Sequence, residues 1–329
     1  MLNAMRYLGY PVNETMIVGG GGALGFDYQK GIFPFLGARS QNMREVFAGG
    51  SSIKWHAVKP ATPEESWEGV VELLQRGIPV VLRVDMRYLP YRYGGKYGPS
   101  YMSFGWHMIT LFGMDLEKGM AYVSDREYDT IQAIRLQDLD KARASKTKVF
   151  PPCREFSWVE PMPQNYKLNW DKLTRNAVHQ LVQNLEPSSS GLGGLNDLKA
   201  LPDNIRRIET YATNRWLLPA IFSSLHGYIE DFGTGGAAFR IMVRDFFEEA
   251  SGSLTTTDFE AAITALNESI TAWHGLSGEF ETISKQIKNV QTKSARDALY
   301  NKAAEQAEIL YKKESSLLMA LKKIDKSQE

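Results

Sequence analysis

His107 and Asp125 are the two residues of this 329-residue sequence whose types and spacing point most directly to chemistry. Two β-rich runs, residues 107–112 and 120–124, flank the turn-forming residues 115–119, which predicts a β-hairpin. With the turn centred on Leu116, His107 and Asp125 become cross-strand partners, whose Cβ atoms lie ~5 Å apart. A carboxylate placed there accepts the imidazole N–H and fixes the tautomer, which suits a general base. The same residues also fit a polar strand start followed by an Asx-turn.

A His–Asp pair of this kind calls for a nucleophile. The single cysteine, Cys153, lies in a proline-rich stretch rather than at a helix N-terminus, where thiolates are favoured. Ser100 and Ser103 lie nearer to His107, but no G-x-S-x-G elbow surrounds them. We interpret their Gly- and Tyr-rich loop as the aromatic rim of a cleft. The rim candidates are Tyr88, Tyr91, Tyr93, Tyr97 and Trp106. No two histidines have the i, i+3 or i+4 spacing of zinc ligands, so no metal site is predicted.

A glycine run offers a rival chemistry, because Gly20, Gly22 and Gly25 have the spacing of a dinucleotide-binding loop. Such a loop needs a strand before it and a helix opening after it. Residues 15–18 can form the strand, but residues 26–37 contain two glycines and a proline, which do not sustain a helix. The run therefore indicates a loop with positive φ angles and close backbone approach beside a cleft. No nucleotide or other cofactor is predicted.

The elements that must position these residues divide the chain into a part with mixed helices and strands and a part with helices alone. Pro63–Arg76 predicts a helix, with Thr62 as N-cap and Gly77 at its end, and residues 78–84 predict a buried strand. Residues 136–143 predict another short helix. The four prolines near residues 151–165 indicate a linker. Beyond it, apolar stripes at helical spacing predict an all-helical region.

These patterns give an α+β fold class with three parts. Residues 1–150 form a mixed α/β domain, residues 151–165 the linker, and residues 166–329 a helical domain. The long amphipathic helices fit either an intramolecular core or a homodimer. Within the helical part, Arg240 fits either an anion contact or a surface or interface position.

Composition narrows the function classes. The net charge is zero, so no strong field attracts nucleic acid or an anionic membrane. The single thiol fits a reducing compartment, and the N-terminus lacks the pattern of a secretory signal. No apolar run is long enough to span a membrane. We therefore predict a cytoplasmic protein that binds neither nucleic acid nor membrane.

Several segments in order resemble the butirosin-biosynthesis protein H family. They are residues 4–26, 76–91, 106–125, 136–143 and, in the C-terminal half, 229–251. The resemblance implies an N-terminal domain similar to papain-type cysteine proteases and a helical C-terminal domain. It also implies cysteine-nucleophile acyl transfer in antibiotic biosynthesis, from a carrier-protein thioester to an amine of an aminoglycoside.

By this resemblance His107 is the general base and Asp125 its orienting partner, while the glycine run lies beside the cleft. The residues expected to line that cleft are Gly22, Gly25, Phe26, Asp85, Tyr88, Tyr91 and Trp106. The family's cysteine precedes the segment that begins here at Ala4, which places it at or just before Met1. The sequence thus carries the base and its partner without the thiol, and as it stands acyl transfer should be abolished or nearly so.

Three functions remain open at this point. The first is a cysteine-type acyltransferase whose thiol is encoded just upstream, with an acyl carrier protein and a small amine as partners. The second is an inactive binding protein that retains the cleft. The third is a cysteine-type amide hydrolase or peptidase.

Overall fold

The computed structural model of the chain describes residues 1–40, 42–148, 150–186, 193–232, 235–254 and 259–327. The chain forms two compact units, each assembled from two separate segments. The first unit contains residues 1–13 and 53–167, and the second contains residues 14–52 and 168–329. The chain therefore leaves the first unit after residue 13 and returns to it at residue 53.

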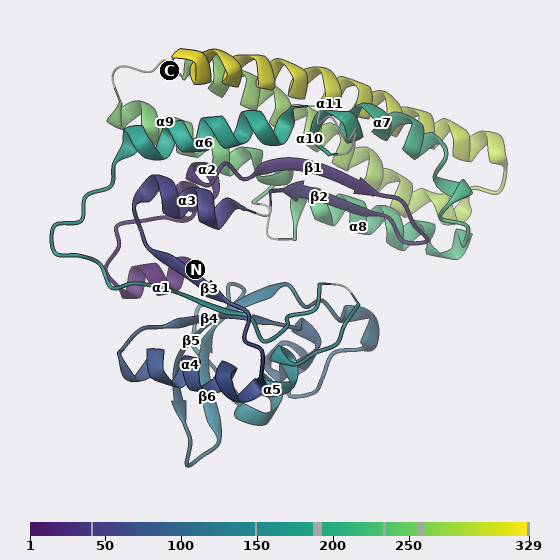
Figure 1. Ribbon diagram of the computed structural model, residues 1–329. Coiled ribbons are helices and arrows are strands. Elements are labelled where there is room, and N and C mark those ends of the chain that lie inside the picture. The colour runs from purple at the N-terminus through teal and green to yellow at the C-terminus, as the bar shows by residue number, and fades with distance from the viewer. Residues whose placement is uncertain (41, 149, 187–192, 233–234, 255–258, 328–329) are drawn as a thin grey trace. The chain divides into compact units, whose positions relative to one another are not determined.

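The first unit is built on a six-stranded antiparallel sheet with the strand order β3-β8-β4-β5-β6-β7 (Figure 1). Its strands are β3 (Trp55–Val58), β4 (Val80–Val84), β5 (His107–Asp115), β6 (Met120–Ser124), β7 (Gln132–Arg135) and β8 (Phe156–Val159). Its helices are α1 (Leu2–Tyr7), α4 (Pro63–Gln75) and α5 (Leu136–Arg143). Short 3₁₀ turns η1 (Met86–Tyr88), η2 (Pro90–Tyr93) and η3 (Ser100–Met102) connect β4 to β5.

The core of the first unit forms where one face of the sheet meets α4 and α5. Alternate residues of β4, namely Val80, Leu82 and Val84, are completely buried there, together with Leu111 of β5 and Leu139 of α5. Alternation of this kind follows from the period of two in a strand. The sheet thereby fixes the positions of β4, β5 and β6, whose ends carry the candidate site.

Helix α4 confirms the predicted start and stop signals. Thr62 and Glu65 form a capping box, since the Thr62 hydroxyl accepts from the Glu65 N–H and the Glu65 carboxylate accepts from the Thr62 N–H. Pro63 is the first helical residue, and Gly77 follows the C-cap with a φ of +73°. The predicted helix over residues 136–143 is α5, and the predicted strand over residues 78–84 contains β4.

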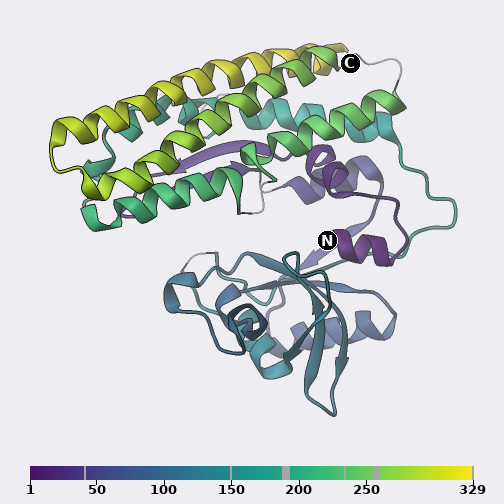
Figure 2. The same cartoon turned by 180° about the vertical axis from the view of Figure 1, so that it is seen from behind.

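The second unit is mostly helical (Figure 2). Its helices are α2 (Glu14–Gly20), α3 (Met43–Ser51), α6 (Trp170–Leu185), α7 (Gly194–Arg206), α8 (Leu218–Glu230), α9 (Arg240–Ser253), α10 (Glu260–Gln286) and α11 (Lys293–Ser327), with short 3₁₀ turns η4 (Ile208–Thr210), η5 (Arg215–Leu217), η6 (Ala237–Phe239) and η7 (Ile287–Asn289). A two-stranded hairpin, β1 (Leu24–Gln29) and β2 (Phe35–Arg39), contacts α6, α7 and α8. The two longest helices, α10 and α11, pack along each other. The predicted apolar stripe on α10 is buried, including Leu266, Ile270 and Trp273.

The glycine run differs from the prediction of a strand followed by a loop. Residues 14–20 form helix α2, and the run ends that helix. A Cβ atom on Gly19 would lie 2.2 Å from the Cβ of Phe246 in α9, and one on Gly20 would lie 2.8 Å from a methyl carbon of Leu173 in α6. Gly22, with a φ of +57°, turns the chain into β1. Glycine is therefore needed here for close helix packing and for one left-handed turn.

Two boundaries also differ from the expected division of the chain. Residues 14–52, expected in the first domain, pack with the helical unit because α2 and α3 contact α6 and α9. Residues 156–159, expected in a linker, form strand β8 between β3 and β4. The prolines at residues 151, 152 and 161 lie outside this strand, so they do not interrupt its hydrogen bonds. The coarser prediction, a sheet in the N-terminal part and a helical C-terminal region, is confirmed.

Candidate active site

The candidate site lies at the end of the sheet where β5 begins and β6 ends. His107 is the first residue of β5 and pairs with Val84 of β4. Asp125 directly follows β6. The predicted hairpin is confirmed, but its register differs from the predicted one by three residues near the turn, where Met114 pairs with Ala121. A β-bulge between Leu111 and Gly113 reduces this difference to two residues at the end that carries the site. Thr110 pairs with Ser124, so Asp125 stands level with residue 109 rather than with His107. A two-residue shift leaves side chains on the same face, so the two side chains still meet diagonally.

The His107–Asp125 contact is short and direct. The imidazole Nε2 lies 2.9 Å from both carboxylate oxygens of Asp125. The Asp125 side chain is 0% exposed, whereas that of His107 is 16% exposed. The carboxylate is therefore sealed within the protein, while the ring that it holds reaches the surface.

Two further side chains hold Asp125 from η2. The Tyr91 hydroxyl donates to Oδ2 at 3.0 Å, and the Arg92 guanidinium donates to the same oxygen at 3.1 Å. Arg92 also pairs with Glu127 at 2.6 Å. Pro90 starts this 3₁₀ turn and fixes its first φ, which directs both side chains toward the end of β6.

The electrostatics keep Asp125 ionised. Burial alone would raise the pKa of Asp125, but the hydrogen bond and charge of His107, the charge of Arg92 and the Tyr91 hydroxyl together hold it below its ordinary value. The pKa of the Tyr91 hydroxyl is raised, first by its own burial and then by the neighbouring carboxylate. Tyr91 thus stays a neutral donor.

This protonation pattern sets the histidine tautomer. An ionised carboxylate only accepts hydrogen bonds, so Nε2 of His107 must carry a hydrogen. The neutral ring then has its basic lone pair on Nδ1. Such a ring can take a proton from a thiol or hydroxyl at Nδ1 while Asp125 holds it in place.

Arg92 is a contact of the candidate site that the sequence does not predict, and Tyr91 has a different contact from the one expected. The sequence predicts Tyr91 in an aromatic rim, yet its hydroxyl binds Asp125 and its ring packs on Tyr128 at 5.4 Å. A usable signal is the segment Pro90–Tyr93, in which an arginine stands between two tyrosines directly after a proline. A cation in so aromatic a loop indicates a buried anionic partner.

Several of the expected cleft residues have structural contacts instead. Asp85 is 0% exposed and accepts hydrogen bonds from the Ser103 and Ser145 hydroxyls and from two backbone N–H groups. It therefore ties three loops together rather than facing a ligand. Ser103 is committed to this contact, which argues against its use as a nucleophile.

The aromatic residues of the expected rim pack in separate pairs. Trp106 is half-buried against Phe150 at 4.8 Å and carries the guanidinium of Arg83 over its ring. Tyr88 packs edge-on against Tyr97. Of the rim candidates, Tyr91 is the one for which a hydrogen bond to the His–Asp pair is described.

Gly22, Gly25 and Phe26 belong to the second unit and are buried within it. Gly22 packs on Gln180 of α6, and Phe26 is 4% exposed with its ring 5.8 Å from that of Trp273. These contacts do not support the prediction that the three residues line a substrate cleft. The same unit buries Arg240 completely, so it is neither a surface residue nor an anion contact facing solvent.

Within the described part of the chain, no three His, Cys, Asp or Glu side chains gather in a way that could hold a metal ion. The helices of that part include none with the length and apolar character needed to cross a membrane.

Two family matches together account for most of the chain. The fold and site define a protein with an α/β sheet unit, a helical unit and a histidine–carboxylate pair at the end of the sheet. Residues 1–126 match the family described as butirosin biosynthesis protein H, N-terminal, and residues 137–321 match a domain of unknown function, DUF4872. The second match spans more than half of the chain, which therefore belongs to the DUF4872 family, and the N-terminal part of the chain is of the butirosin biosynthesis protein H type. No curated protein matches the chain.

Proposed function

We propose that this protein is a cysteine-type acyltransferase of antibiotic biosynthesis, with His107 as the general base and Asp125 as the residue that orients it. The observation that carries the proposal is a surface-reaching imidazole whose Nε2 is held at 2.9 Å by a sealed carboxylate. The match of residues 1–126 to a family named for butirosin biosynthesis supports the pathway class.

The proposed reaction has two steps that share one base. Nδ1 of His107 takes the proton of a thiol, and the thiolate attacks the carbonyl carbon of a carrier-protein thioester. The carrier thiol leaves with that proton, and the acyl group stays on the enzyme. A substrate amine then attacks the acyl-enzyme, gives its proton to His107, and releases the enzyme thiol as the amide forms.

The family resemblance expects the thiol at or just before Met1, directly ahead of α1. The position of α1 supports this expectation. The Asn3 side chain in the first turn of α1 donates to the Ser124 hydroxyl at 2.5 Å, and Ser124 directly precedes Asp125. The first turn of α1 thus lies beside the strand end that carries the site. A helix with a thiol placed opposite a sheet with its base is the papain-type arrangement, which we include in the proposal.

A direct assay tests this function. The protein is translated with any in-frame codons upstream of Met1, and acyl transfer from carrier-protein thioesters to aminoglycosides is followed by mass spectrometry. His107→Ala should lower kcat/KM for transfer by about 10²–10⁴. His179→Ala, which removes an exposed histidine of α6, is the matched control and should leave transfer unchanged.

Two outcomes would end the proposal. One is transfer that survives His107→Ala at full rate. The other is loss of transfer in Cys153→Ser, because that result would assign the thiol to a different part of the unit. Release of free acid at equal rates with and without the amine would favour the amide hydrolase or peptidase instead.

A second function, binding without catalysis, is favoured by the contact of Arg92 with Asp125. The guanidinium binds an oxygen of the carboxylate that orients the imidazole, so Asp125 is not reserved for His107. On this account acyl carriers or small amines bind equally well to the wild-type protein and to His107→Ala, and no product forms with either. Calorimetric titration of both proteins separates this function from the first.

A further inference from the structure

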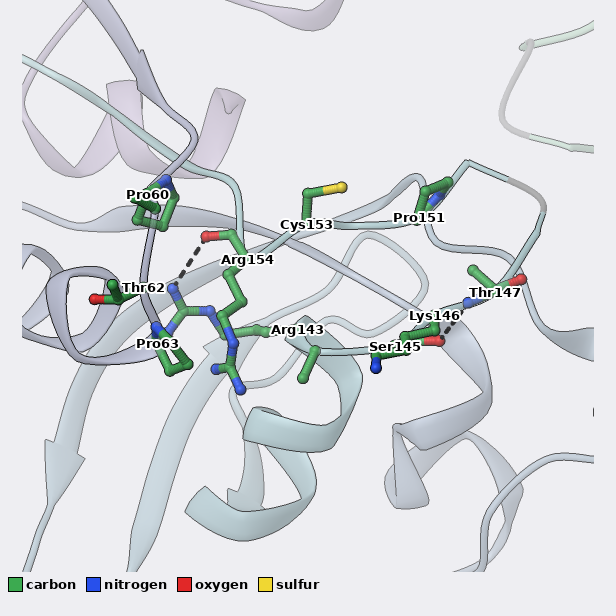
Figure 3. A pocket seen from close by; sticks show the side chains of 12 residues that line it. Pro60, Thr62, Pro63, Arg143, Ser145, Lys146, Thr147, Pro151, Cys153 and Arg154 are labelled. Carbon is green, nitrogen blue, oxygen red and sulfur yellow. Dashed lines mark hydrogen bonds between the residues drawn. The ribbon is translucent and has the colours of Figure 1, made fainter.

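A cavity in the sheet unit has an unusual charge balance. It has a volume of about 470 Å³ and is formed by the loop before α4, the end of α5 and the residues that follow it, and the segment around Cys153 (Figure 3). Its lining includes three cationic residues, Arg143, Lys146 and Arg154, and no Asp or Glu. The hydroxyl side chains of Thr62, Ser145 and Thr147 also line it.

Arg143 is the most informative of these residues because it is completely buried yet lacks a carboxylate partner. It is 0% exposed, and its Nη2 donates to the Ser66 hydroxyl and, at 3.4 Å, to the Arg154 carbonyl. Its Nε and Nη1 have no hydrogen-bond partner among the described residues. Figure 3 shows its guanidinium lying between Pro63 and Arg154.

Asp140, the carboxylate whose charge acts on Arg143, is already hydrogen-bonded to other groups. Asp140 accepts from both terminal nitrogens of Arg154 and from the Trp67 indole N–H. Burial lowers the pKa of Arg143 to about 10, and the charge of Arg154 acts in the same direction while that of Asp140 opposes it. A buried guanidinium with unsatisfied donors lowers the stability of the fold. An anionic partner that accepts from those donors would remove this free-energy penalty.

The charged residues that line the cavity are all cationic, although two carboxylates behind the lining, those of Glu65 and Asp85, accept hydrogen bonds from lining residues. Asp140 neutralises Arg154, but Lys146 is exposed and no ion pair is described for it. The N-terminus of α4 contributes little, because Glu65 already accepts from the backbone N–H groups of Ala61 and Thr62. Two cationic groups, those of Arg143 and Lys146, are therefore without a described partner carboxylate at this cavity.

We propose that this cavity binds the phosphate group of a small phosphorylated molecule. An anion can pair with these two cationic groups, and phosphate oxygens accept well from guanidinium nitrogens such as the Nε and Nη1 of Arg143 that lack a described partner. The proposal is independent of acyl transfer, since no lining residue is among the hydrogen-bond partners described for His107 or Asp125.

The single cysteine makes a direct test possible. Cys153 is exposed and lines the same cavity, and Figure 3 shows its sulfur directed away from the two guanidinium groups. The rate of its alkylation by neutral iodoacetamide reports on the cavity for two reasons. The negative charge of a bound dianion disfavours the reactive thiolate form of Cys153, and the bound dianion also obstructs the reagent. The rate is measured with inorganic phosphate or acetate, each against sodium chloride at equal ionic strength.

Phosphate should slow alkylation saturably, and acetate should have little effect. Lys146→Gln should weaken the apparent phosphate affinity about tenfold. Lys148→Gln removes a neighbouring exposed lysine outside the cavity lining and serves as the matched control, with unchanged affinity. Because both lysines are exposed, neither variant should fail to fold.

Arg143 is tested by Arg143→Met, with folding checked by circular dichroism. This variant should lose the phosphate effect and gain thermal stability, because it removes the unsatisfied donors. The proposal fails if phosphate slows alkylation no more than chloride does, if acetate protects as well as phosphate, or if the two lysine variants behave alike. Retention of the phosphate effect in a folded Arg143→Met protein would also overturn it.

Discussion

Asp125 in the sheet unit and Glu314 in the helical unit are both completely buried carboxylates, and each is held by an arginine and an aromatic donor. Glu314, on α11, accepts two hydrogen bonds from Arg240 at 2.9 and 3.0 Å, one from Trp273 at 2.8 Å and one from Ser269. Asp125 differs in one partner, because it also contacts the titratable imidazole of His107, which is 16% exposed.

That difference separates a structural cluster from one suited to chemistry. Every partner named for Glu314 is itself buried, and Arg240 is 0% exposed, so the cluster joins α9, α10 and α11 without reaching a substrate. In the cluster at Asp125, the buried carboxylate instead contacts an imidazole that is partly exposed. A buried ion pair alone is therefore a poor sign of function, and a buried charge attached to an exposed base is a better one.

Breaking the Glu314 cluster should have the largest effect. Glu314→Gln leaves the buried Arg240 without a counter-charge and should reduce the free energy of unfolding by about 3–5 kcal/mol. Urea denaturation followed by circular dichroism measures this loss. The control, Glu308→Gln, breaks an exposed pair with Arg206 and should cost less than about 1 kcal/mol. Equal losses in the two variants would contradict the structural role given to Glu314.

Close packing in the helical unit gives the next largest effect. Gly19→Ala places a methyl group 2.2 Å from the Cβ of Phe246, so it should destabilise the protein by about 1–3 kcal/mol. Gly278→Ala, inside α10 with nothing within 4 Å, should instead stabilise it by about 0.5–1 kcal/mol. Thermal unfolding of both variants compares them. If Gly19→Ala left the stability unchanged, close helix packing would not be the reason for glycine at this position.

Removing one donor to Asp125 should have a smaller effect. Tyr91→Phe deletes a hydrogen bond to a buried carboxylate and should cost about 1.5–2 kcal/mol. Tyr128→Phe is the matched control, because its hydroxyl donates only a long hydrogen bond, to the Tyr91 carbonyl at 3.4 Å. The same urea experiment measures both, and an equal cost for the two would show that the Tyr91 contact adds nothing.

The two carboxylates should also make stability depend on pH, in the same direction. The folded pKa of Asp125 lies below 3.8 and that of Glu314 below 4.5, despite the burial that opposes both changes. Each group therefore contributes stability that is fully present above its ordinary pKa and is lost as the pH falls through the folded pKa. A tenfold difference in acidity between the folded and unfolded states corresponds to about 1.4 kcal/mol of stability.

Unfolding free energies measured in urea between neutral pH and pH 3 check this dependence. The wild-type protein should lose stability steeply below about pH 4. Asp125→Asn and Glu314→Gln should each show a shallower loss over that range, because neither replacement titrates. Parallel pH profiles for all three proteins would contradict the lowered pKa values.

The sequence is most informative where local rules decide the structure. The capping box at Thr62 and Glu65, the buried run that forms β4, and the hairpin over residues 107–124 all follow from patterns that are local in the sequence. The error in register is harmless at the site, because the β-bulge between Leu111 and Gly113 reduces it from three residues to two, and a two-residue difference keeps His107 and Asp125 on one face.

Long-range packing explains what the sequence does not reveal. Residues 15–18 are β-branched and apolar enough for a strand, yet contacts of α2 with α3, α6 and α9 make them helical. Tyr91 and Arg92 contact Asp125 although more than thirty positions separate them from it in the sequence. They do so from a 3₁₀ turn whose direction no local pattern specifies. Arg240 finds Glu314 across 74 positions, which spacing alone cannot predict.

The central claim is that Asp125 holds His107 with its basic nitrogen free. Long-range ¹H–¹⁵N correlation spectra of the five histidines test it most directly, with assignment by His107→Gln. The wild-type protein should show His107 at neutral pH as the tautomer with hydrogen on Nε2, and Asp125→Asn should lose that preference. A wild-type His107 with its hydrogen on Nδ1 would contradict the account, because its basic lone pair would then face the Asp125 carboxylate instead of a substrate.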